Sequence, residues 1–152
     1  MEQFDVLIIG AASAGSFLAR RLSENGHRVL ILERHAKENL GRRLDIFHVA
    51  KADFARFSLP LPETADDFAF EFSGGRTYSA FDRFSKKNEG TVVGMHMHRY
   101  IARLNGWAHE AGAEIRYQAK FIDFLYEDGR IAGAVYEQGG ERHTVAAKLV
   151  AD

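Results

Sequence analysis

One stretch near the start of the chain, DVLIIGAASAGSFLARRLSENGHRVLILER (residues 5–34), constrains the fold more than any other feature. Its first part, Val6–Ile9, is short, apolar and β-branched, which is typical of a strand buried on both faces. Gly10 follows directly and permits a sharp turn where a side chain would clash. We expect a helix from about Ser13 and a second buried strand over Val29–Leu32. This order predicts a Rossmann-like α/β fold built on a parallel sheet.

The glycine turn and an acid after the second strand together predict a site for the ADP half of a dinucleotide. Free amides and the positive end of the helix dipole attract a pyrophosphate at the helix start. Glu33 lies 23 residues after Gly10, close to the spacing of an acid that accepts hydrogen bonds from the adenosine ribose. Its charge disfavours the 2′-phosphate of NADP. The candidate cofactor-binding residues of this unit are Gly10, Ala12, Ser13, Ala14, Gly15, Glu33 and Arg34.

Ala12 departs from the Gly-x-Gly-x-x-Gly pattern, because it stands where the second glycine is expected. Its methyl group crowds the approach of the backbone to a pyrophosphate, and a slightly shifted phosphate would relieve that crowding. Gly15 keeps the third glycine and lets the helix lie close to the neighbouring strand. Arg34 has two interpretations, a cover for the adenine face or a solvent-facing charge at a strand end.

Composition narrows the class of protein. With 152 residues, 46% of them hydrophobic and 27% charged, the chain is typical of one globular domain. With a net charge of −1, the chain has no overall excess of positive charge that would indicate binding to nucleic acid or to an anionic membrane. Without cysteine, the chain has no disulfide and no thiolate site, and no apolar run approaches the ~20 residues of a membrane span. We expect a cytoplasmic protein with a small-molecule partner, no nucleic-acid partner and no transmembrane segment, and its oligomeric state stays open.

The middle of the chain predicts a helix followed by antiparallel strands. Residues 35–43 are polar apart from Leu40 and predict a loop, and the spacing of apolar residues over 44–57 predicts a helix. Phenylalanines alternate over 68–72, a period of two that is typical of a strand. Gly74-Gly75 would turn that strand into a second one, and a short third strand is expected further on. These two strands are expected over 76–81 and 90–95.

The last third of the chain predicts one helix and several strands. The helix is expected over 98–111, ended by Gly112, with Ile101, Leu104 and Ala108 on its apolar side. Asp128-Gly129 suits the type I′ turn of a hairpin. The predicted strands cover 115–117, 121–127, 130–137, 142–146 and 148–151, of which the second, third and fourth form an antiparallel meander.

This plan resembles one large family, the FAD-dependent oxidoreductases of the p-hydroxybenzoate hydroxylase and geranylgeranyl reductase type. The resemblance is carried by the opening motif, by HRYIARLNGWAHEAGAEIRY (98–117), by the meander and by the final KLVAD (148–152). It implies that residues 1–152 form an FAD/NAD(P)-binding Rossmann-like domain, the N-terminal portion of a longer flavoprotein. Residues 66–96 would then contribute part of the substrate-domain sheet. The implied cofactor is FAD, and NAD(P)H is the candidate electron donor.

The resemblance also implies further cofactor contacts. In the family the last strand runs into an Asp-Gly motif whose aspartate binds the ribityl chain, and Asp152 matches that aspartate. An arginine of the family falls on Met97 here, so Arg99 is the candidate in its place. Arg42 and Arg43 follow the ribose acid by about ten residues, where guanidinium groups suit FAD phosphates, and a solvated basic loop is the equal alternative.

Two other groups of residues have competing interpretations. In related reductases the phenylalanine-rich region helps to enclose an apolar substrate, although alternating aromatic residues more commonly pack a core. If the chain is truncated, these rings would instead be exposed. His96 and His98 would share a face of a strand, but a metal site needs further ligands, so a polar surface is favoured.

We predict the FAD-binding portion of an oxidoreductase that either reduces an alkene-like substrate or activates oxygen for hydroxylation. Geranylgeranyl-reductase-like chemistry is favoured by the resemblance alone. Because flavin supplies the reactivity, no catalytic acid or base is assigned. The alternatives are an NAD- or ADP-binding module without redox activity, which the meander argues against, and an inactive fragment.

Overall fold

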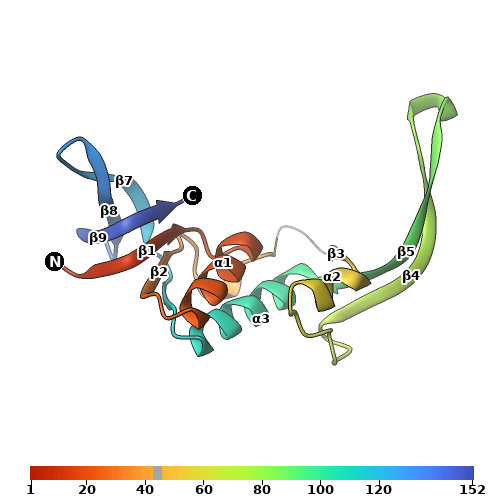
Figure 1. Ribbon diagram of the computed structural model, residues 1–152, viewed down its shortest axis with the longest axis horizontal. Coiled ribbons are helices and arrows are strands. Elements are labelled where there is room, and N and C mark those ends of the chain that lie inside the picture. Colours follow the sequence, from red (N-terminus) through yellow and green to blue (C-terminus); the bar gives the residue numbers. More distant parts are fainter. Residues whose placement is uncertain (43–45) are drawn as a thin grey trace. The chain divides into compact units, whose positions relative to one another are not determined.

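The structure is a computed structural model that describes residues 1–42 and 46–152. The chain divides into two compact units, the first formed by residues 1–42 with 101–152 and the second by residues 43–100 (Figure 1). Within the described residues, no helix has the length and apolar character needed to cross a bilayer.

The first unit is built on a six-stranded sheet in the order β6-β2-β1-β9-β8-β7. The first four strands of this order pair in parallel, and the last three form the antiparallel meander. Its elements are β1 (Gln3–Ile9), α1 (Ser13–Glu24), β2 (Val29–Leu32), η1 (Lys37–Asn39), β6 (Glu114–Arg116), β7 (Lys120–Glu127), β8 (Arg130–Gln138) and β9 (Glu141–Ala151). Helix α3 (Met97–Glu110) begins in the second unit and continues into the first.

The core of the first unit lies around the parallel strands. All four residues of β2 are buried, as expected for a short apolar strand with a neighbour on each side. Leu7 and Leu30 have no exposed surface, and burial of each side chain contributes about 1.5–3 kcal/mol. Ala19 of α1 is also fully buried. The two buried strands and the helix between them, predicted at the start of the chain, are therefore present.

Local signals placed most elements of the first unit correctly. Helix α1 begins at Ser13 and ends at Glu24, followed by the cap residue Asn25 and by Gly26 in a left-handed conformation. Asp128 and Gly129 have φ values of 50° and 76°, as a type I′ turn requires. The division of the last segment into two strands was wrong. Strand β9 is continuous, because it pairs with β8 up to Ala146 and with β1 from Ala146 onward.

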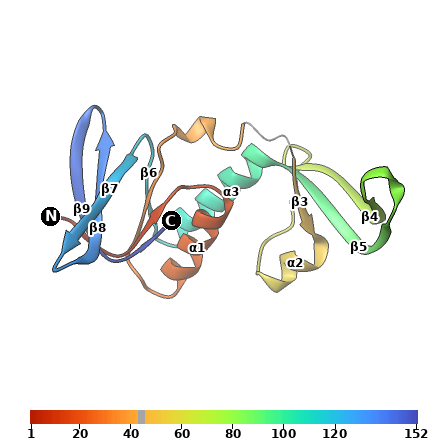
Figure 2. The same ribbon diagram turned by 90° about the horizontal axis from the view of Figure 1, so that it is seen from above.

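The second unit is a three-stranded antiparallel sheet in the order β3-β5-β4 (Figure 2). Its elements are β3 (Ile46–Ala50), α2 (Lys51–Arg56), β4 (Phe68–Tyr78), η2 (Ala80–Asp82) and β5 (Ser85–His96). Phe54, Val93 and Met95 are among the buried apolar residues of this unit.

The helix predicted over 44–57 was largely wrong. Residues 46–50 form β3, and only Lys51–Arg56 are helical; Leu44 lies outside the described residues. In β3, Phe47 and Val49 are half-buried and the residues beside them are exposed, a period of two. Antiparallel pairing with β5 supplies the hydrogen bonds that a helix would otherwise have supplied internally.

The predicted turn at Gly74-Gly75 was also wrong. Strand β4 continues through both glycines to Tyr78, with an irregular register between Ser73 and Gly75 where Gly74 has a φ of 72°. A glycine in the left-handed region inside a strand is typical of a β-bulge. The turn lies instead at 79–84, so β5 is much longer than the predicted strand over 90–95.

Replacing Gly106 with alanine should stabilise the fold. Gly106 lies inside α3, and a Cβ atom added there would meet no heavy atom within 4 Å. Alanine loses less backbone entropy than glycine in a helix, so we expect the free energy of unfolding to rise by about 0.5–1 kcal/mol. Urea-induced unfolding followed by circular dichroism measures this change, and a decrease would show that the position is more crowded than the structure indicates.

Candidate functional site

Three neighbouring parallel strands end at one edge of the first sheet. Ile9 at the end of β1 pairs with Leu32 of β2, and Ile8 pairs with Ala151 of β9. Gly10, Glu33 and Asp152 therefore follow the carboxyl ends of adjacent strands. Strand β2 lies on one side of β1, and β9 lies on its other side. The order of the strands therefore reverses at β1, which makes this edge a topological switch point. Open α/β sheets bind ligands at such points.

The turn after β1 requires glycine at two positions for different reasons. Gly10 has a φ of 98°, in a region that residues with a side chain rarely adopt. An added Cβ atom would meet nothing within 4 Å, so glycine is needed here for its backbone conformation and not for lack of space. Gly15 has no room, because an added Cβ atom would lie 2.1 Å from the Gly10 carbonyl oxygen. The first turn of α1 is thereby held directly against the bend.

The start of α1 is suited to an anion. Ala12 has the extended conformation of a cap residue but no side-chain hydrogen bond to the helix, and the first turn of this fully described helix contains no acid. Ala12 and Ala14 are exposed, and the first amides of a helix have no acceptor within the helix itself. The donor set fits a pyrophosphate, which accepts hydrogen bonds from such amides and is attracted by the helix dipole.

Glu33 is oriented toward the bend. Its side chain is only 4% exposed. One carboxylate oxygen accepts a hydrogen bond from the Ala11 amide at 2.9 Å, and the other accepts one from the His35 amide at 2.7 Å. Each oxygen keeps a second lone pair for a further donor. An acid fixed in this way can accept hydrogen bonds from ribose hydroxyls without first having to be ordered.

The peptide group of Ala11 is held from both sides. Its carbonyl oxygen accepts hydrogen bonds from Ser16 Oγ and from Asn105 Nδ2, each at 3.0 Å. Asn105 Nδ2 also donates to the Ile101 carbonyl at 2.8 Å. Together with the bond from the Ala11 amide to Glu33, these contacts fix the orientation of the bend.

Tyr117 fixes the orientation of the Asn105 amide. The Tyr117 hydroxyl donates a hydrogen bond to Asn105 Oδ1 at 3.3 Å, which leaves Nδ2 to donate toward Ala11. Burial and then the negative charge of Glu33 raise the pKa of Tyr117, so this hydroxyl keeps its proton at neutral pH.

Ser16 and Asn105 are two residues of this site that were not predicted from the sequence. Both are buried, with exposed fractions of 0% and 3%. A usable signal existed for Asn105, because it occupies a helical position on the apolar side formed by Ile101, Leu104 and Ala108. A polar residue on such a face must find a partner inside the protein. No comparable signal identifies Ala11 as that partner, since it lies 94 residues away.

A cavity of about 430 Å³ lies beside the bend and is lined by residues of the first unit. Gly10, Ala12, Glu33 and Arg34 line it together with apolar residues such as Leu40. Arg34 donates a hydrogen bond from Nε to the His35 ring at 3.2 Å. Apolar walls with one carboxylate at the side suit an adenosine, which has an aromatic base and a ribose with two hydroxyls.

The remaining predicted cofactor residues are placed differently. Asp152 is exposed directly after β9. Arg42 is exposed and donates a hydrogen bond to the Glu38 carbonyl, and Arg43 lies outside the described residues. Arg99 belongs to the second unit, where it forms ion pairs with Asp66 at 2.9 Å and Asp67 at 3.5 Å. Their contacts with a cofactor remain predictions.

His96 and His98 lie close together in the second unit, with ring centroids 6.3 Å apart. Among the residues that the structure describes, no group of three or more His, Cys, Asp or Glu is arranged to hold a metal ion.

Replacing Asn105 with aspartate should weaken FAD binding in a pH-dependent way. A carboxylate cannot donate to the Ala11 carbonyl, and it places negative charge against that oxygen, so we expect about tenfold weaker binding at neutral pH. Protonation of the new aspartate in mild acid restores a donor and should recover part of the affinity. Flavin titration across pH tests this, with Asn25→Asp, at the exposed end of α1, as the control. Equal affinity of Asn105→Asp and the wild type at neutral pH would contradict the role assigned to Asn105.

Comparison with known proteins gives the family. Residues 3–151 match a family described as an FAD binding domain. The digeranylgeranylglycerophospholipid reductase of Methanocella arvoryzae is 27% identical over 98% of this chain and 38% of its own length. Digeranylgeranylglycerophospholipid reductase 1 of Methanopyrus kandleri is 32% identical over 97% of this chain and also 38% of its own. The chain thus spans about 38% of the length of these curated relatives.

Solved structures show the same fold. A geranylgeranyl bacteriochlorophyll reductase-like protein from Thermoplasma acidophilum has a TM-score of 0.81 at 24% identity, covering 99% of this chain and 38% of that one. The myxobacterial chondrochloren halogenase, an FAD-dependent halogenase, has a TM-score of 0.75 at 21% identity, covering 99% and 37%. The fold class predicted from the sequence is confirmed, and the chain belongs to the FAD-binding domain family.

Proposed function

We propose that this chain is the FAD-binding portion of a flavin-dependent oxidoreductase of the geranylgeranyl reductase type. The observation that carries the proposal is the buried Glu33 carboxylate, which is bonded to the Ala11 amide beside the Gly10 bend at the switch point of the sheet. In this arrangement a carboxylate that can accept hydrogen bonds from a ribose is held at a fixed position beside a turn that can bind a phosphate.

Each part of the site has a task toward FAD. Glu33 would accept hydrogen bonds from the adenosine ribose, and the amides over 12–15 would donate to the pyrophosphate, since the Ser16 amide already donates to the Ala12 carbonyl. Asp152 would bind the ribityl chain, and Arg34 would cover the adenine. Arg42, Arg43 and Arg99 are further candidates for the phosphates and the flavin. When bound, FAD supplies the redox chemistry, and these residues only hold and orient it.

An apolar substrate is supported by the second unit. His48, Phe70 and Phe72 form an aromatic cluster on the β3-β5-β4 sheet, with ring centroids 5.4–6.5 Å apart. The Phe70 ring lies directly over Gly94, where an added Cβ atom would come within 2.7–2.9 Å of it. Relatives with 27–32% identity are named as reductases of a geranylgeranyl lipid. We therefore infer that the reaction is the reduction of an alkene in an apolar substrate. NAD(P)H as the electron donor and a cytoplasmic location remain predictions.

Competition between nucleotides tests the cofactor proposal. The 152-residue chain is titrated with FAD, and ADP, FMN and NAD are then added as competitors. Because the Gly10 bend, the start of α1 and Glu33 are assigned to the ADP half, we expect ADP to displace FAD and FMN to leave it bound. Displacement by FMN would contradict the assignment, and tighter binding of NAD than of FAD would favour the nucleotide-binding module without redox activity. An absence of any nucleotide binding would favour the inactive fragment.

A further inference from the structure

The peptide group that joins Ala11 to Ala12 has its carbonyl on the buried side of the bend. The oxygen accepts hydrogen bonds from Ser16 Oγ and Asn105 Nδ2, and both of these side chains are buried. A trans peptide is planar, so its N–H points in the opposite direction to its C=O. The Ala12 N–H therefore points away from the interior, and Ala12 itself is exposed and lines the cavity of about 430 Å³.

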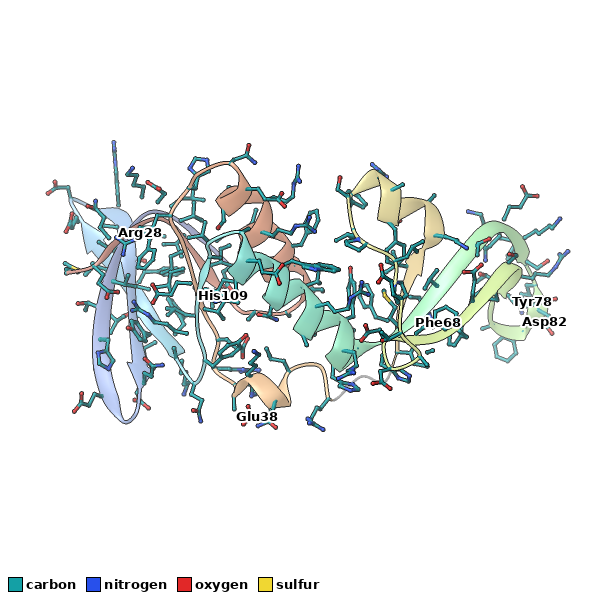
Figure 3. All side chains as sticks on the ribbon, turned by 90° about the horizontal axis from the view of Figure 1, so that it is seen from below. Arg28, Glu38, Phe68, Tyr78, Asp82 and His109 are labelled. Atoms are coloured by element: carbon teal, nitrogen blue, oxygen red, sulfur yellow. The ribbon has the colours of Figure 1, made fainter. Side chains whose placement is uncertain are left out.

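The two side chains that hold this carbonyl come from different helices. Ser16 belongs to α1, and Asn105 belongs to α3, one turn before His109. The two helices lie side by side in the first unit (Figure 3), where the Arg20 guanidinium lies 5.4 Å from the centre of the Trp107 ring. The carbonyl is thus fixed by two separate elements of the fold, and each element holds it through a buried donor.

Two successive amides of the bend have different tasks as a result. The Ala11 amide already donates to the Glu33 carboxylate at 2.9 Å, and the Ala12 amide follows it in the chain. Ala12 has a φ of −76° and a ψ of −173°, which alanine adopts without strain, so the missing second glycine leaves this amide in place. Hydrogen bonds to a carbonyl also polarise the N–H of the same peptide. The Ala12 amide is therefore both oriented and strengthened as a donor.

We propose that Ser16 and Asn105 are positioning residues that aim the Ala12 amide at a phosphate group of the bound cofactor. The inference rests on the proposed FAD site and adds to it the two side chains that set the direction of its phosphate donor. Neither side chain touches the cofactor, because both act through the Ala11 carbonyl. Since they bond to the same oxygen, either one alone restrains the peptide, and only the loss of both frees it to rotate.

Titration with adenosine and with ADP tests the proposal, because the two ligands share the ribose and only ADP carries phosphates. We expect Ser16→Ala and Asn105→Ala each to bind ADP about threefold more weakly than the wild type, and the double variant about thirtyfold more weakly. Adenosine binding should change by less than about twofold in all three variants. The matched control is Ser23→Ala/Asn25→Ala, which makes the same two changes at the far end of α1 and should preserve both affinities.

The outcomes separate positioning from simple support of the fold. Equal losses of adenosine and ADP binding in the double variant would mean that the two side chains only stabilise the bend, and would overturn the proposal. A double variant that binds ADP like the wild type would also overturn it. Wild-type protein that binds neither ligand would instead contradict the FAD site itself, and the inference with it.

NMR spectroscopy of the wild type tests the direction of the amide without any substitution. In the ¹⁵N-labelled chain, the Ala12 amide proton should move downfield on addition of ADP, as expected for a new hydrogen bond to a phosphate, and should change little with adenosine. In the double variant this downfield movement should be lost even when ADP saturates the site. An Ala12 amide that responds equally to adenosine and ADP in the wild type would overturn the proposal.

Discussion

Replacing Glu33 with alanine should weaken FAD binding by about two orders of magnitude. The carboxylate is the proposed acceptor for the ribose hydroxyls, and hydrogen bonds to a charged group contribute about 1.5–3 kcal/mol each. The substitution also removes the acceptor of the Ala11 and His35 amides, so the bend itself loses a fixed partner. Flavin titration measures the affinity, and chemical unfolding of the cofactor-free chain measures the accompanying loss of stability.

Replacing Glu33 with glutamine removes the negative charge of the side chain and keeps its size. The two amides bond to different oxygens of Glu33, and glutamine has only one side-chain oxygen, so one amide loses its acceptor. Glu33→Gln also removes the charge that should repel a 2′-phosphate. We expect the wild type to bind ADP much more tightly than 2′-phosphorylated ADP, and the variant to discriminate less. Glu24→Gln, on the exposed end of α1, is the control and should preserve the discrimination.

If Glu33→Ala bound FAD as tightly as the wild type while remaining folded, the ribose assignment would be wrong. Unchanged discrimination against the 2′-phosphate in Glu33→Gln would exclude the charge as its source. The two results are independent, because the first measures contact with the cofactor and the second measures repulsion of an added group.

The sequence was informative wherever structure depends on neighbouring residues. Gly10 adopts the left-handed conformation that the turn requires, and Asp128-Gly129 forms the expected hairpin turn. The strand after α1 is buried at every position, as its unbroken apolar composition predicts. These features follow from local sterics and hydrophobicity, and they were sufficient to place the Gly10 bend between β1 and α1.

The features that the sequence concealed depend on distant partners. The segment 46–50 has apolar spacing compatible with a helix and becomes a strand because β5 offers an edge for pairing. The role of Asn105 depends on Ala11, and the ion pairs of Arg99 depend on Asp66 and Asp67. In these cases the sequence indicates that a polar group needs a partner without indicating which partner it finds.

Replacing Gly15 with alanine should have the largest effect on stability. The new methyl carbon would lie 2.1 Å from the Gly10 carbonyl oxygen and 3.2 Å from Ile8 Cγ2. The nearest obstacle is backbone, so no side-chain rotation relieves it, and the start of α1 must move away from β1. Overpacking of this kind costs about 3 kcal/mol, which for a chain of this size corresponds to a melting temperature lower by about 6–12 °C.

The same displacement should weaken FAD binding, because the amides at the helix start would no longer lie over the bend. Gly106→Ala is the matched control, since it makes the same chemical change in a helix of the chain where an added Cβ atom meets nothing within 4 Å. One substitution should therefore destabilise and the other stabilise, although helix propensity alone favours both. A stabilising Gly15→Ala would mean that α1 does not lie against the bend, and the phosphate-binding role of its first turn would then have to be abandoned.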